Sequence, residues 1–117
     1  MGALTEQALE FSVRILKLKK FLFEKCNDSI VSGQIARSGT SIGANINEAN
    51  YAQSKADFIS KMQIALKETS ETEYWINVLY KSGYITSTMY NSLIKDCLSI
   101  KRMLISSIKT SKSINTK

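Results

Sequence analysis

Proline is absent from the 117 residues, and the five glycines stand at positions 2, 33, 39, 43 and 83. Because proline and glycine are the strongest interrupters of helices, long helical segments can run here without a break. Apolar residues recur at spacings of three and four in four separate segments, which is the period of one face of an α-helix. The pattern therefore predicts four helices.

Capping signals place the ends of these helices. Asp28 or Ser29 can cap the second helix, the pair Ser54 and Asp57 resembles a capping box for the third, and Gly83 can end the third. Four helices of roughly 20 residues or more, joined by short turns, favour an all-α fold, an antiparallel up-down-up-down four-helix bundle. We expect the bundle to span residues 1–109 and residues 110–117 to form a frayed polar tail.

The second predicted helix is rich in small residues, including Gly39 and Gly43. Glycine costs about 1 kcal/mol relative to alanine inside a helix, so two glycines four apart indicate that another backbone approaches there. The alternative is a weakened or kinked helix.

The first predicted helix is apolar over a wide arc. One strip consists of Leu4, Ala8, Phe11, Ile15, Leu18 and Leu22, and an adjacent face carries Leu9, Val13, Leu16 and Phe23. A chain of this length is too short to surround both, so the second face would stay exposed in a monomer. We therefore expect Leu9, Val13, Leu16 and Phe23 to form the interface of a homo-oligomer. A core strip that is merely broad is the alternative.

Composition narrows the class of protein. Apolar residues make up 44% and charged residues 22%, as in an ordinary globular domain, and neither a signal peptide nor a membrane span is evident. We expect a soluble, cytoplasmic protein with no cofactor.

The chain has no histidine, which excludes Ser-His and Cys-His catalytic pairs and histidine-ligated metals. Cys26 and Cys97 lack metal or redox spacing, and we interpret them as buried small apolar residues.

The formal net charge is +6, and residues 86–117 carry six basic side chains against one acidic one. A positive field of this kind favours RNA or DNA through counterion release, although it can also serve solubility alone. No sequence-reading motif is evident, so contacts would be mainly to phosphates. The predicted nucleic-acid-binding residues are Lys17, Lys19, Lys20, Lys95, Lys101, Arg102 and Lys109.

Two sets of polar side chains on the predicted helices could form a functional site. Glu68 and Glu71 share a helix face, as carboxylates in magnesium or di-iron bundles do, but no second acidic pair accompanies them. We therefore predict neither a metal site nor an enzyme. A polar set in the second helix consists of Arg37, Ser41, Asn45 and Glu48. It could line a polar site, but hydrogen bonding between helices or subunits is the favoured role.

The run from Gln34 to Ala49 contains the motif Arg-Ser-x-x-Ser-Ile-x-x-Asn-Ile-x-Glu. It is followed by Ser54, Asp57, Phe58, Ala65, Glu68, Thr69, Glu71 and Gly83. Together these residues resemble the bacterial 23S ribosomal RNA intervening-sequence protein family, over roughly residues 8–108. The resemblance implies an antiparallel four-helix bundle assembled as a homopentamer, without known catalytic activity. Relatives include the accessory variability protein of diversity-generating retroelements, a basic pentamer that binds nucleic acid and associates with a reverse transcriptase.

Three functions follow as hypotheses from these observations. The first is a homo-oligomeric bundle that binds RNA or DNA as an accessory factor, with affinity that falls steeply as salt rises. The second is a protein-protein scaffold whose partner docks on an exposed helix face and is captured independently of salt. A magnesium enzyme using Glu68 and Glu71 is the third and weakest.

Overall fold

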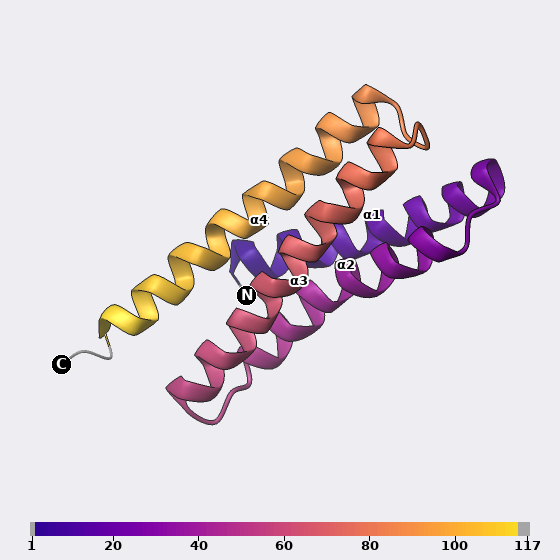
Figure 1. Cartoon of the computed structure of the whole chain (residues 1–117). Helices are drawn as coiled ribbons and strands as arrows, with labels where there is room; N and C mark the ends of the chain where they lie inside the picture. Colours follow the sequence, from indigo (N-terminus) through magenta and orange to yellow (C-terminus); the bar gives the residue numbers. More distant parts are fainter. Residues whose placement is uncertain (1, 115–117) are drawn as a thin grey trace.

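The computed structural model describes residues 2–114, and within this range the chain forms four α-helices. Helix α1 spans Ala3–Cys26, α2 spans Ile30–Ala49, α3 spans Lys55–Lys81 and α4 spans Ser87–Ile114. Successive helices run antiparallel and pack against each other in a body of 52 × 21 × 21 Å (Figure 1). The prediction of an all-α, antiparallel four-helix bundle is confirmed.

The caps form much as the sequence indicates. Ser29 occupies the N-cap position of α2 without a side-chain capping bond, and the Asp28 carboxylate accepts instead from the Ser32 amide at 2.8 Å. The Ser54 hydroxyl accepts from the Asp57 amide at 3.0 Å and begins α3. After α3, Gly83 adopts a φ of +79°, a left-handed conformation that glycine tolerates well and that reverses the chain toward α4.

The core lies along the centre of the bundle, where the predicted apolar strips of all four helices meet. Its largest fully buried apolar side chains are Ile15, Leu22, Ile35, Ile42, Ile46, Ile76, Leu79, Ile100 and Leu104. Two threonines on α3, Thr69 and Thr72, are also fully buried, and their hydroxyls are satisfied by backbone carbonyls one turn earlier. The core is therefore continuous along the bundle, and its polar groups are paired.

Helices α1 and α2 approach each other closely at the two glycines of α2. A Cβ atom built on Gly39 would lie 2.9 Å from the Ile15 side chain, and one on Gly43 would lie 3.4 Å from the carbonyl oxygen of Ala8. Helix α2 is continuous through both positions. The predicted close helix contact is confirmed, and neither glycine ends the helix.

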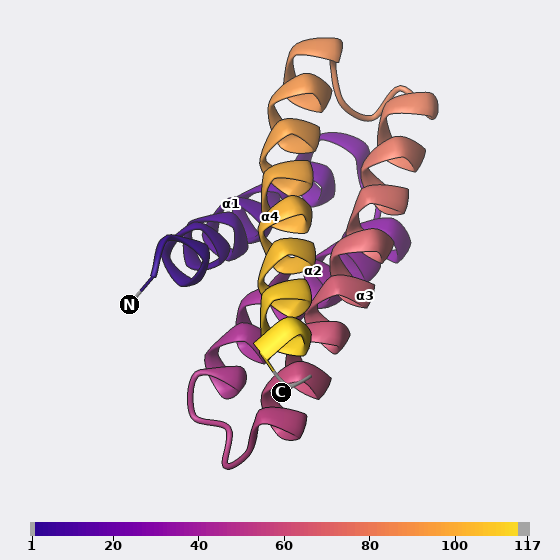
Figure 2. The same ribbon diagram turned by 90° about the vertical axis from the view of Figure 1, so that its left-hand side faces the viewer.

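Helices α1 and α4 make the sparsest contact of the four neighbouring pairs. Figure 2 shows that α1 runs across α4 instead of alongside it. Polar groups join the two helices: Arg14 donates to Asp96 at 2.8 Å and to the Ser92 hydroxyl at 2.7 Å, and Ser99 contacts Gln7 at 3.2 Å. Hydrogen bonds and an ion pair therefore join the two helices on this sparsely packed side of the bundle.

Two expectations need correction. Helix α4 continues to Ile114, five residues beyond the predicted boundary at Lys109, because its residues 110–114 contain neither proline nor glycine and nothing stops the helix. Of the predicted tail, residues 115–117 lie outside the described residues.

Cys97 is fully buried as predicted, whereas Cys26 is only half-buried because it ends α1 at the surface turn.

Candidate functional site

The second apolar face of α1 is exposed to solvent. Leu9 is 60% exposed, Val13 48%, Leu16 53% and Phe23 62%, whereas the neighbouring strip from Ala8 to Leu22 is buried. These fractions exclude a core strip that is merely broad. The four residues are called the outer α1 face below.

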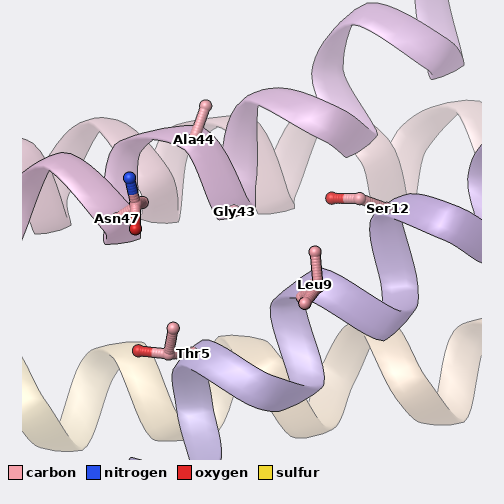
Figure 3. A pocket seen from close by; sticks show the side chains of 6 residues that line it. All are labelled: Thr5, Leu9, Ser12, Gly43, Ala44 and Asn47. Atoms are coloured by element: carbon pink, nitrogen blue, oxygen red, sulfur yellow. The ribbon is translucent and has the colours of Figure 1, made fainter. Parts of the chain in front are cut away.

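A groove of about 270 Å³ borders this face, between α1 and α2. Figure 3 shows Leu9 projecting from α1 toward α2, on which Gly43, Ala44 and Asn47 border the groove. The groove exists because Gly43 and Ala44 offer no bulk to fill it. Its lining residues are Thr5, Leu9, Ser12, Gly43, Ala44 and Asn47. The small residues of α2 were the sequence signal for this groove, although Thr5 and Ser12 could not be assigned to it from the sequence.

The predicted nucleic-acid-binding residues all lie on α1 and α4. Six of them are exposed: Lys17, Lys19, Lys20, Lys95, Arg102 and Lys109. Lys101 differs, because it is half-buried and its ammonium group lies 3.0 Å from the Glu73 carboxylate on α3. Lys101 therefore ties α4 to α3 and is less available to a ligand than the others.

The positive charge is segregated by helix. Helix α1 carries five basic and three acidic residues and α4 carries five and one, whereas α2 carries one of each and α3 four of each. Helices α2 and α3 are thus electrically neutral, and the basic excess of the described chain resides on α1 and α4. The pair of helices that packs most sparsely is therefore also the basic pair.

The polar set of α2 faces α3. Arg37 forms ion pairs with Glu68, at 3.3 Å, and with Glu71, and the Trp75 indole donates to Glu71 at 3.1 Å. The Arg37 hydrogen bond is the main cause that lowers the pKa of Glu71, with the Trp75 hydrogen bond second, and Glu71 in turn raises the pKa of Arg37. The carboxylates considered for magnesium are therefore engaged by an arginine.

The rest of the polar set has local partners. The Ser41 hydroxyl donates to the Arg37 carbonyl, the Asn45 amide donates to the Ser41 carbonyl, and Glu48 pairs with Lys61 of α3 at 3.2 Å. Arg37 and Glu48 are exposed at the surface of the α2–α3 contact, not embedded in it. Across residues 2–114, no group of three or more His, Cys, Asp or Glu side chains is arranged to hold a metal ion. No helix in the same range is long and apolar enough to cross a membrane.

Comparisons with known proteins agree with this architecture. The sequence matches the family of 23S rRNA-intervening sequence proteins over residues 3–106. No curated protein matches the chain. A crystal structure of a protein of unknown function from Bacteroides thetaiotaomicron, of the S23 ribosomal protein family, is 52% identical in sequence and superposes with a TM-score of 0.91. The alignment covers 92% of this chain and 99% of that one.

Matches of this extent in both sequence and fold show more than a shared architecture. The chain belongs to the family of 23S rRNA-intervening sequence proteins, a family of unknown function.

Proposed function

We propose that this protein is a non-enzymatic homo-oligomer, a pentamer, that binds RNA or DNA as an accessory factor. The observation that carries the proposal is the segregation of charge, because α1 and α4 hold the basic excess while α2 and α3 are neutral. Six of the predicted basic residues are exposed and form no ion pair within residues 2–114. Lysines in this state carry counterions that a phosphate backbone can displace.

The binding is to phosphates and is weakly selective for sequence. Lysine ammonium groups act as point charges and carry no base-reading geometry, so they position a nucleic acid without reading it. Assembly increases the affinity, because several copies present the same basic helices to one nucleic-acid molecule. Once one copy is bound, each further contact with that molecule is intramolecular.

The outer α1 face supports the oligomer. Exposing four large apolar side chains of one helix to water is unfavourable in a monomer, and burying them drives association. The number of five subunits rests on the family resemblance. Light scattering during size exclusion, without nucleic acid and at moderate and high salt, would then give about five times the 13.1 kDa chain mass.

Nucleic-acid binding is tested by titrating a labelled single-stranded RNA and a labelled DNA duplex across a salt series. We expect log affinity to fall linearly with log salt. A Lys19→Gln, Lys95→Gln, Arg102→Gln variant should reduce that slope by about two to three, since each lost phosphate contact removes about 0.7–0.9.

The matched control is a Lys55→Gln, Lys67→Gln, Lys81→Gln variant, which removes the same charge from the exposed surface of neutral α3. It should bind nearly as the unmodified protein does. An equal loss of affinity in both variants would show that binding depends only on the net charge of the protein. The absence of any salt-dependent binding would refute the nucleic-acid part of the proposal.

A further inference from the structure

A second groove lies on the far side of the bundle, between α3 and α4. Its volume is about 350 Å³, and its lining residues are Gln63, Leu66, Ile105, Ile108, Lys109 and Lys112. Leu66, Ile105 and Ile108 supply an apolar floor, and Ile105 is 47% exposed. This arrangement is called the α3–α4 groove below.

The rim of the α3–α4 groove is basic. Lys109 and Lys112 are exposed and form no ion pair within residues 2–114. After Asp96, α4 contains no acidic residue that could neutralise them. An apolar floor beside two unpaired lysines is complementary to a helix with an apolar strip and acidic neighbours, and the floor offers nothing to a hydrated phosphate backbone.

The amino-terminal half of α1 has that pattern. Leu9 and Val13 of the outer α1 face are separated by one helical turn, and Glu6 and Glu10, also one turn apart, lie along the edge of the same strip. Both glutamates are exposed and form no ion pair within the described range. The chain thus displays both halves of a complementary pair, each without a partner.

One copy cannot join its own two halves. Helix α1 packs on α2 and sparsely on α4, and within residues 2–114 it is not a neighbour of α3, which lies diagonally across the bundle. The outer α1 face and the α3–α4 groove therefore lie on different sides of the bundle. An interface between two different surfaces is head-to-tail, and such interfaces close into rings when the rotation between copies allows it.

We propose that the α3–α4 groove of one copy receives the Glu6–Val13 segment of the next copy. Leu9 and Val13 cover the apolar floor, and Glu6 and Glu10 face Lys109 and Lys112. Lys109 then serves the subunit interface instead of the nucleic acid. The inference rests on the proposed homo-oligomer and specifies how its copies meet.

Charge reversal tests this pairing on the full chain, in the absence of nucleic acid. The Lys109→Glu, Lys112→Glu variant and the Glu6→Lys, Glu10→Lys variant each place like charges across the interface. Each should dissociate at a protein concentration at least about tenfold higher than the unmodified protein, by light scattering over a dilution series. The variant that carries all four reversals restores opposite charges and should return to within about threefold of the unmodified protein.

Recovery of assembly in the fourfold variant distinguishes loss of the proposed ion pairs from damage to the helices themselves. Glu6 lies in the first turn of α1 and Lys112 in the last turn of α4, where reversal also opposes the helix dipole. Those helix effects add in the fourfold variant, so they cannot produce recovery. A Lys25→Glu, Lys81→Glu variant makes the same charge change on exposed residues outside both surfaces and should assemble normally.

The failures are distinguishable. If the unmodified protein is a monomer, the proposed homo-oligomer itself falls. If it is an oligomer that neither reversal weakens, or if the fourfold variant does not recover, this pairing is overturned while the homo-oligomer stands.

Discussion

At the scale of single residues, Gly39 illustrates how one missing methyl group sets a helix separation. Ile15 occupies the space beside it, is fully buried and is branched at Cβ, so it has little freedom to move away. A larger residue would therefore push α1 and α2 apart instead of displacing a flexible side chain. The sequence indicated the close approach, but only the structure identifies Ile15 as the contact.

We expect Gly39→Ala to lower the free energy of unfolding, because the cost of overpacking, about 1–3 kcal/mol, exceeds the gain in helix propensity. Gly33→Ala in the same helix meets nothing within 4 Å and should raise that free energy by up to about 1 kcal/mol. Urea unfolding of the two variants gives the comparison. Equal stability of the two would show that the bundle absorbs the methyl group without strain.

At the scale of secondary-structure elements, the ion pairs of α2 with α3 add to their apolar contact. Arg37 reaches Glu68 and Glu71 from the neighbouring helix, and Glu48 reaches Lys61 near the other end of the contact. Pairs this exposed each contribute less than about 1 kcal/mol. They therefore add only modestly to the stability of two helices that the buried strip already holds together.

The Arg37 pairing has a pH dependence with a defined sign. Because the pKa of Glu71 is lowered in the folded chain, its contribution is fully present above the ordinary value of 4.5 and is lost as the pH falls through the folded-state value. Arg37→Met should therefore destabilise the protein at pH 6 and much less at pH 3, in denaturant unfolding. Lys81→Met, at an exposed lysine without an ion pair in the described range, should show little of this change. A constant difference for Arg37→Met at both pH values would contradict the assignment.

At the scale of the whole molecule, the bundle has one side that packs tightly and one that does not. The contacts of α2 with both neighbours are extensive and include glycine-mediated approach, whereas α1 and α4 meet sparsely and carry the basic excess. Repulsion between two basic helices is weakest when they cross, which is how α1 and α4 are arranged (Figure 2). The charge proposed to attract nucleic acid therefore lies on the two helices that meet most sparsely.

Cys97 offers a probe of global unfolding. Burial, with Glu73 the next cause, raises the pKa of its thiol to about 12, so almost no thiolate is present near neutral pH. In a Cys26→Ser variant, we expect an alkylating reagent to label Cys97 only at the rate at which the whole bundle opens. Labelling that is fast in the absence of denaturant, and unchanged as denaturant is added, would mean that α4 separates locally. The unmodified protein should show one fast thiol, because Cys26 is half-buried at the end of α1.

The sequence by itself determined the helices, most of their caps, the buried strips and the exposed outer α1 face. All of these depend on residues within about four positions of one another, so spacing alone encodes them. Tertiary structure decided which residues of different helices meet: Arg37 with Glu71, Lys101 with Glu73, Gly39 with Ile15, and the side chains that line the α3–α4 groove. These contacts depend on how each helix is rotated and at what angle it crosses its neighbours, and that geometry is set by the packing of the entire core.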